Sequence, residues 1–369
     1  MEMHKENLME EKIDINPIPY LTWTWLKINK DTVSYDFSLA EDYGKESQIP
    51  EGIEISSGKS IKTQLSEPQF SVGNVAADLI SKAAAEGKIY TITKSQAADY
   101  SKALIIRIKI DKNTASHQII HALSGTSAKI IIVYEGDTSS DSQGDILSGV
   151  ITKVYAEDDS HLEITKVQLC GSKVNQIDDT AIVCGERAKV SFNQIELGGS
   201  HLNAGFHATL EGYQSEFYSD TSYLVHNNQY IDMNQVVVHK GKKTICDMKT
   251  DGTVKDNSTK TYRGTIDLLK GSAGSNGNEM ETTLLLSPEA VVKSAPIILC
   301  GEEDIKAEHG STLGKLSPEM LFYMNSRGID QATAEELLSR AKITSTSAKI
   351  PDENIQNEIL NFLDVINKK

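Results

Sequence analysis

The sequence predicts a mainly β protein with helical regions at both ends. Runs of β-branched residues begin near residue 104, as in Ile130-Ile131-Ile132-Val133, and are typical of strands. From 148 to 287 such segments alternate with turns at intervals of roughly 10–20 residues, which leaves too little chain for helices between them. Apolar residues follow a helical spacing before residue 100 and again after Pro318. An elongated β body with helical ends accounts for all three observations.

Residues 1–100 are expected to form a partly helical N-terminal region. The segment 75–85 is rich in alanine with helical spacing, and a glycine follows it as a stop signal. The Pro17-Ile18-Pro19 segment favours a proline-led entry into a helix. We expect the nearby Trp23 and Trp25 to anchor that helix to the β body.

Residues 101–316 are expected to form the β body. Turns rich in Gly, Asn and Asp, such as Gly198-Gly199-Ser200 and Asp251-Gly252, separate its strands. The turn spacing is irregular, and no strict repeat motif recurs along the region. The pattern alone therefore leaves two architectures open, a β-sandwich and a parallel β-helix.

Residues 317–369 are expected to form two or three helices that pack on the β body. Apolar residues recur every three to four positions in two stretches, which Gly328 separates. A last helix is expected from Pro351 onward. Its apolar face consists of Ile355, Ile359, Leu360, Phe362, Leu363 and Ile366.

The charge balance excludes some classes of partner. Lys and Arg total 37 against 52 Asp and Glu, which gives a net charge of −15. A surface this acidic repels a phosphate backbone, so we expect no nucleic-acid partner. No apolar run reaches the length of about 18 residues that a membrane helix needs, and the first twelve residues are polar. The protein is expected to be cytoplasmic, with no membrane partner.

The four cysteines predict reduced thiols. They lie far apart in the sequence, without the paired spacing of structural zinc sites or the density of a disulfide scaffold. Taken singly, each is expected to be buried as a small apolar side chain. The four are Cys170, Cys184, Cys246 and Cys300.

Two segments near the C-terminus carry a family resemblance. Residues 308–316 read EHGSTLGKL, and residues 321–329 read LFYMNSRGI. They resemble the signature of the SufB/SufD family, particularly its SufD-like branch, whose members read HGATxGxL and then LFYLxSRGI. Weaker matches, such as the TLLLSPEA segment at 283–290, precede them in the same order. The resemblance implies a right-handed parallel β-helix core with helical N-terminal and C-terminal regions.

The resemblance also implies a function. It indicates a non-catalytic scaffold subunit of the SUF iron–sulfur cluster assembly complex, acting with a SufB-like scaffold and a SufC-like ATPase. Pairing with SufB would use the edge of the β-helix, and a homodimer remains an alternative. No Walker motif occurs in the chain, so ATP turnover is expected in the SufC-like partner and this chain is not expected to be an enzyme.

Two departures from the family pattern bear on cofactor binding. The segment 273–282 is rich in Gly and Asn and suggests a turn where the family has a strand. Ala307 stands where SufD members often have a cysteine, and no cysteine occurs between 282 and 287. We therefore expect this chain alone to hold no cofactor tightly, and iron or an iron–sulfur cluster to be bound only transiently in the complex.

His309 is the leading candidate ligand for iron. It is expected at a glycine-flanked turn, and neutral imidazole binds iron well. The resemblance implies that it faces SufB near the cluster assembly site. Glu308 is a candidate second ligand or a base that holds the imidazole, and Cys300 is a weaker candidate on a neighbouring face. The alternatives are a capping surface histidine, a solvated glutamate and a buried core cysteine.

The segment after Pro318 is the candidate docking surface for the SufC-like ATPase. Its residues combine aromatic, Met and Arg character, which binding hot spots favour. The alternative is that they pack the helix on the chain's own β body. The residues are Leu321, Phe322, Tyr323, Met324 and Arg327.

Two other functions remain as rivals. A β-helical carbohydrate-active enzyme would need two or more carboxylates converging in a groove. The dense acidic segments, Glu157-Asp158-Asp159 and Asp178-Asp179, are both expected in turns. An architectural homo-oligomer that uses the same β edge is the second rival.

Overall fold

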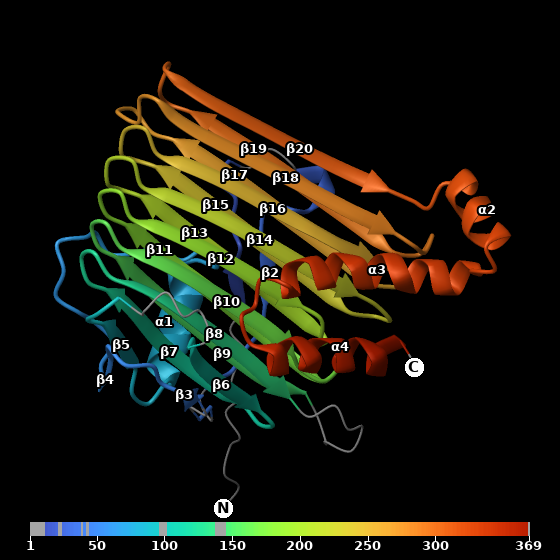
Figure 1. The fold of residues 1–369 in the computed structure, drawn as a ribbon, viewed down its shortest axis with the longest axis horizontal. Helices are drawn as coiled ribbons and strands as arrows, with labels where there is room; N and C mark the ends of the chain where they lie inside the picture. The colour runs from blue at the N-terminus through green and yellow to red at the C-terminus, as the bar shows by residue number, and fades with distance from the viewer. Residues whose placement is uncertain are drawn as a thin grey trace, which may run out of the picture.

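The protein is a parallel β-helix, in which the chain winds through two long facing sheets (Figure 1). The computed structural model describes residues 12–20, 24–37, 40–41, 44–95, 102–136 and 145–367. The first sheet contains, from edge to edge, β20 (Ile305–Gly314), β18 (Ser275–Leu285), β16 (Ile245–Val254), β14 (Glu216–Val225), β12 (Lys189–Glu196), β10 (His161–Leu169), β8 (Ser127–Gly136), β6 (Leu104–Ile110) and β3 (Gly44–Gln48). The second contains β19 (Val291–Cys300), β17 (Thr259–Leu268), β15 (Tyr230–His239), β13 (His201–Leu210), β11 (Val174–Cys184), β9 (Ile146–Ala156), β7 (Thr114–Ala122), β5 (Lys88–Ile92) and β4 (Ile53–Ser57). Of the two open architectures, the β-helix is confirmed.

Successive turns of the β-helix stack through parallel pairing, but the turns differ in length. The turn that leads from Ser127 to its register partner His161 is longer than the next one, which leads from His161 to its partner Lys189. The turn from Ile245 to Asn276 has a length between these two. This variation explains why no strict repeat is visible in the sequence. Only β3 and β4, at the N-terminal end, join their sheets antiparallel.

The interior is filled by alternate side chains of both sheets, because successive strand residues point to opposite faces. A large apolar cluster occupies much of it, including Ile132, Ile164, Phe192 and Phe206. Burying such side chains is the main stabilising contribution of the β body. Polar and charged side chains also lie inside, and they form two clusters that concern the candidate site.

The N-terminal region is less helical than predicted. Helix α1 (Asn74–Ala83) confirms the alanine-rich prediction and packs on β7 and β9. The proline segment, however, follows strand β1 (Ile13–Ile15), which pairs antiparallel with β2 (Asp31–Val33). Only a short 3₁₀ turn, η1 (Thr24–Leu26), lies between them in the described part of this segment. The predicted helix is therefore wrong, and the β body begins before residue 101, with β3 to β5.

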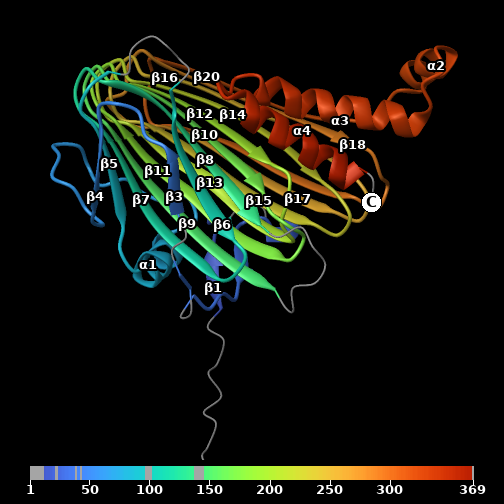
Figure 2. The ribbon, with the colours of Figure 1, turned by 60° about the horizontal axis from the view of Figure 1, so that its bottom comes forward.

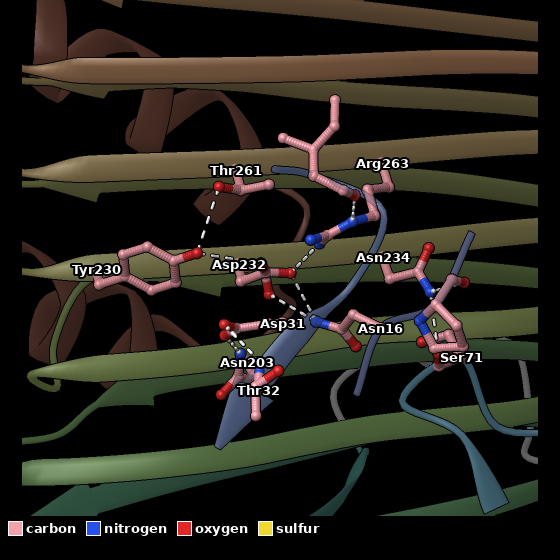
Figure 3. Close-up of polar contacts among 12 residues, drawn as sticks. Asn16, Asp31, Thr32, Ser71, Asn203, Tyr230, Asp232, Asn234, Thr261 and Arg263 are labelled. Carbon is pink, nitrogen blue, oxygen red and sulfur yellow. Dashed lines mark hydrogen bonds and ion pairs between the residues drawn. The ribbon is translucent and has the colours of Figure 1, made fainter. Parts of the chain in front are cut away.

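The expected tryptophan anchor is wrong for Trp25, whose side chain is 78% exposed. Trp23 lies outside the described residues. Polar contacts hold the N-terminal segment instead (Figure 3). The Asn16 side chain donates to Asp232 Oδ1 at 2.7 Å, and the buried Arg263 donates through Nε to the Ile28 carbonyl at 2.6 Å while pairing with Asp232. Buried ions and amides must be satisfied, so this network fixes where the segment crosses the second sheet.

Three C-terminal helices follow β20, in agreement with the predicted two or three. They are α2 (Pro318–Ser326), α3 (Gln331–Ser347) and α4 (Glu353–Asn367). The apolar face predicted for the last helix is confirmed, since Ile355, Ile359 and Leu363 are fully buried. Helices α3 and α4 cover the outer face of the first sheet, and α1 lies on the opposite side of the β-helix (Figure 2). Among the described residues, no helix is long and apolar enough to cross a membrane.

Two segments predicted as turns are strands. Asp178-Asp179 lies in the middle of β11 and is buried, and residues 275–285 form β18, which pairs with strands on both sides. The prediction failed because Asp, Gly and Asn are usually depleted in strands. Here Asp178 points inward to Lys166 (2.6 Å), while Asp179 points outward and accepts the Ser71 hydroxyl (2.9 Å).

Candidate functional site

The candidate site lies at the C-terminal end of the β-helix, where the last turn has no covering turn. Strands β19 and β20 are the outer strands of their sheets, and within the described residues each pairs on one side only. Their free edges therefore expose backbone N–H and C=O groups that can pair with another chain. Figure 1 shows these two strands at one end of the stack, followed by α2.

His309 lies in the middle of β20, so its predicted position at a turn is wrong. The glycine beside it continues the strand instead of bending it. His309 pairs in register with Glu279 of β18, two residues before the pair formed by Ser311 and Glu281. The Ser311 hydroxyl donates to the buried Glu281 carboxylate at 2.7 Å, which shows that this face of β20 points inward. His309 lies two residues before Ser311, so its side chain points to the same face of the strand. It is nevertheless exposed, because no further turn of the β-helix covers it among the described residues.

Glu308 is exposed and lies on the other face of β20. It pairs in register with Asn278, whose side chain hydrogen-bonds to Asp247 on the outer surface at 2.9 Å. Because neighbouring strand residues point in opposite directions, the structure does not bring Glu308 and His309 together. The sequence-based pairing of Glu308 with His309 therefore has no support in the geometry.

Cys300 is the exposed exception among the four cysteines. Cys170, Cys184 and Cys246 are buried as predicted, but Cys300 ends β19 and is exposed. Ser294 and Ser311 both hydrogen-bond Glu281, so they face each other across the last turn. Cys300 therefore lies about four residues, or roughly 13 Å, along the strand from the position that faces His309. The structure does not bring this thiol and the imidazole together.

A buried ion cluster, which was not predicted from the sequence, lies directly beneath the last turn of the β-helix. Lys260 of β17 and Glu281 of β18 form an ion pair in which both side chains are at most 1% exposed. Hydroxyls of Ser294, Ser311 and Thr283 also donate to Glu281, at 3.0, 2.7 and 3.4 Å. Burial lowers the pKa of Lys260 well below the usual lysine range. Glu281 is thus surrounded by donors from several strands of the last two turns.

A second carboxylate of this cluster, Glu279, has no well-formed hydrogen bond on either oxygen, although the Tyr262 hydroxyl and the Lys260 charge lie close enough to act on its pKa. It is fully buried, and burial raises its pKa to about 7. Its carboxylate reaches across the interior to Gly264, where a Cβ atom would overlap it. The sequence signal was the alternation Glu279, Glu281, Thr283, which places all three side chains on one face of a strand.

A similar ion cluster lies deeper in the β-helix. Lys166 of β10 donates to Asp178 of β11 at 2.6 Å, and the Tyr134 hydroxyl donates to the same oxygen at 3.0 Å. Glu196 of β12 lies beside them, and its pKa is raised to about 8, first by burial and then by the charge of Asp178. The two clusters share a lysine, a paired carboxylate and a second carboxylate of raised pKa.

Helix α2 exposes most of its large side chains. Phe322 is 76% exposed and Tyr323 is 60% exposed, and Arg327 lies 5.4 Å from the centre of the Tyr323 ring. Leu321 and Met324 are half-buried, and Leu321 lines a groove of about 220 Å³ between α2, α3 and the loop before β19. None of the helix residues is buried. The alternative that this helix packs on the β body is therefore wrong for Phe322 and Tyr323.

Metal-ligating side chains do not gather in one place in the part of the chain that the structure describes. No group of three or more His, Cys, Asp or Glu residues is arranged to hold a metal ion there. Each candidate ligand at the open end thus stands apart from the others. The dense acids proposed for a carbohydrate-active enzyme are also engaged locally, since Asp158 accepts from the Glu186 N–H (2.7 Å) and Asp159 pairs with Arg187.

Comparisons with known proteins identify a family and several relatives of this chain. A family model described as the SufBD core domain of SUF system FeS cluster assembly matches residues 106–342. An iron–sulfur cluster assembly SufBD family protein of Arabidopsis thaliana chloroplasts is 26% identical over 229 residues, which are 59% of this chain and 41% of that protein. SufD of Bacillus subtilis is 26% identical over 149 residues (40% of this chain, 34% of SufD), and SufD of Escherichia coli is 23% identical over 203 (54% and 48%). The chain spans about a third to a half of the length of these curated relatives.

Proposed function

Because the chain belongs to the SufBD core family of the SUF iron–sulfur cluster assembly system, we propose that it acts there as a non-catalytic scaffold subunit. The observation that carries this proposal is the pairing of an open β-helix end with an exposed aromatic helix. The free edges of β19 and β20 suit a second β-helix, and α2 suits a globular partner. The two surfaces follow each other in the chain, so one subunit can bring two partners together.

The partner at the β edge is proposed to be a SufB-like scaffold, with a second copy of this chain as the alternative. Unpaired strand edges are templates for adding another sheet. His309 lies on the inward face of that edge and is exposed, so it can supply one ligand to iron or a cluster at the junction. Because the described residues hold no set of three ligands, the partner is proposed to supply the others.

The partner at α2 is proposed to be a SufC-like ATPase. Phe322 and Tyr323 are exposed on α2, and Arg327 lies over the Tyr323 ring at the end of the helix. Aromatic and Arg side chains of this kind often contribute much of the binding free energy at interfaces. ATP hydrolysis would occur in that partner, and the resulting movement would reach the open end through the short connection between β20 and α2. Assembly of this kind is proposed to take place in the cytoplasm.

The test of this proposal measures binding of the host's SufC-like ATPase by titration calorimetry. Changing Phe322 and Arg327 together to Ala should weaken binding by about 2 kcal/mol or more, in the range of hot-spot truncations. Trp25→Ala is the matched control, because it removes an equally exposed aromatic side chain from the N-terminal region. Unchanged affinity in the folded double variant would contradict the docking role of α2.

The proposal also specifies what the isolated chain holds. Purified anaerobically without partners, the chain should contain little iron and be colourless, because His309 and Cys300 lie too far apart to share an ion. Metal analysis and the visible absorption spectrum measure this. A stoichiometric brown chromophore that Cys300→Ser removes would show that this chain holds a cluster by itself.

A further inference from the structure

Glu279 is a buried carboxylate with few partners. Neither of its oxygens has a well-formed hydrogen bond, and the Tyr262 hydroxyl and the Lys260 charge only partly offset its burial. An ionised carboxylate in such a place is costly unless it is paired or hydrogen-bonded. Glu279 lies on β18, one strand inside the open end. A further hydrogen-bond partner can therefore come only from its own turn of the β-helix or from the turn on either side.

The neighbouring donors inside the β-helix are already engaged. Lys260 is paired with Glu281 and also donates to Ser294 at 3.2 Å. The Tyr262 hydroxyl has a long hydrogen bond to Gln235 Oε1 (3.4 Å), and it also lies close enough to Glu279 to lower the pKa of that carboxyl. A carboxylate can accept several hydrogen bonds, and a further donor that can reach Glu279 lies on the last turn of the β-helix.

That neighbour is His309. It is the register partner of Glu279, and its side chain points to the same face of the sheet. Register partners in adjacent strands have Cβ atoms about 5 Å apart, which is within reach of a hydrogen bond between an imidazole and a carboxylate. The His309 side chain is exposed, so its ring has room to rotate about its side-chain bonds.

We propose that Glu279 is a positioning residue for His309, accepting a hydrogen bond from one ring nitrogen so that the other nitrogen faces out of the open end. This inference rests on the proposed function, in which the outward nitrogen is a ligand to iron or a cluster. Histidines that bind metals usually donate their other N–H to a carboxylate, which fixes the tautomer and the ring orientation. The sequence neighbour Glu308 cannot take this part, because it points to the opposite face of β20.

The experiment reads the tautomer of His309 in the isolated chain. The nine histidines are labelled with ¹⁵N, and the His309 ring is assigned from its loss in His309→Ala. Spectra are recorded at pH 8.5, where histidines are generally neutral and the Glu279 carboxylate is ionised, because burial raises its pKa only to about 7. In the wild type the two ring nitrogens should have well-separated shifts, one protonated and one not.

Variants of Glu279 test whether its carboxylate fixes the tautomer of His309. Glu279→Met removes the acceptor and should bring the two ¹⁵N shifts together, as expected for a ring that exchanges between tautomers, whereas Glu279→Gln should give an intermediate result. Both should fold, because Lys260 keeps its ion pair with Glu281 in these variants. Glu308→Gln is the matched control and should match the wild type.

Wild-type shifts in Glu279→Met, or the same change in Glu308→Gln as in Glu279→Met, would overturn the proposal. No partner, metal or cluster is present in these measurements. A failure here therefore leaves the proposed scaffold function intact, and loss of ATPase binding by the α2 variants leaves this result intact.

Discussion

The two ion clusters inside the β-helix have the same composition but different surroundings. In the deep cluster, Lys166 and Asp178 lie under further turns on both sides, and each side chain is at most 2% exposed. In the terminal cluster, Lys260 and Glu281 are equally buried, but the Ser311 hydroxyl that covers them belongs to an exposed strand. A sealed cluster must be satisfied entirely by its own residues, whereas a terminal cluster can be completed by water or by another chain. The same chemistry is therefore structural in one place and available for function in the other.

The largest loss of stability is expected when the lysine of either cluster is removed, and it should differ between the two clusters. Lys166→Met leaves the Asp178 carboxylate in a sealed interior, where breaking a buried pair typically costs about 3–5 kcal/mol. Lys260→Met should cost roughly 1–3 kcal/mol, because Glu281 keeps three hydroxyl donors and lies next to the open end. Urea unfolding at pH 7 measures both. Equal losses for the two variants would show that the terminal cluster is as sealed as the deep one.

A pH dependence should mark the deep cluster. The pKa of Glu196 is raised by burial to about 8 from an ordinary value of 4.5, so the native state binds the proton more tightly than the unfolded state. Its contribution to stability is complete below pH 4.5 and is lost as the pH rises through 8. Between pH 5 and pH 8.5 the wild type should lose on the order of 4 kcal/mol relative to Glu196→Gln, since one pKa unit corresponds to about 1.4 kcal/mol. Parallel stability curves for the two proteins would contradict this.

The smallest expected effects come from removing one hydroxyl at each cluster. Tyr134→Phe deletes a donor to Asp178 that water cannot replace, and we expect a loss of about 1–2 kcal/mol. Ser311→Ala deletes a donor to Glu281 from an exposed strand, and water should limit the loss to about 0.5 kcal/mol. Thermal unfolding of both variants checks the difference. A larger loss of stability for Ser311→Ala than for Tyr134→Phe would contradict the view that the deep cluster is sealed and the terminal cluster is open to water.

Local patterns in the sequence predicted the helices and strands whose burial follows from the spacing of nearby residues. The apolar face of α4 follows a helical spacing, and Ile355, Ile359 and Leu363 are buried as that spacing requires. The β-branched runs at 104–110 and 130–134 are strands, because such residues suit a half-buried pleated surface. The family resemblance, and not the pattern, distinguished the β-helix from a sandwich.

Features that depend on stacking could not be predicted from neighbouring residues. The strands β11 and β18 contain Asp178 and Glu281, which are stable inside only because Lys166 and Lys260 reach them from other strands. Adjacency in sequence suggested Glu308 as the partner of His309, but the strand register places Glu279 beside His309 from the preceding turn of the β-helix. Because the turns differ in length, that register is not readable from a single sequence.

Cluster assembly by the reconstituted complex tests the central claim most directly. The chain, its SufB-like partner and the SufC-like ATPase are combined anaerobically with iron and a sulfur donor, and the growth of cluster absorbance is followed. His309→Ala should bind both partners and unfold like the wild type, because an exposed side chain contributes little to stability, yet assemble clusters at least ten times more slowly. His161→Ala, which removes an exposed strand histidine far from the open end, should assemble at the wild-type rate. A wild-type rate for His309→Ala would show that the open end of this β-helix is not the place where the subunit contributes to the cluster.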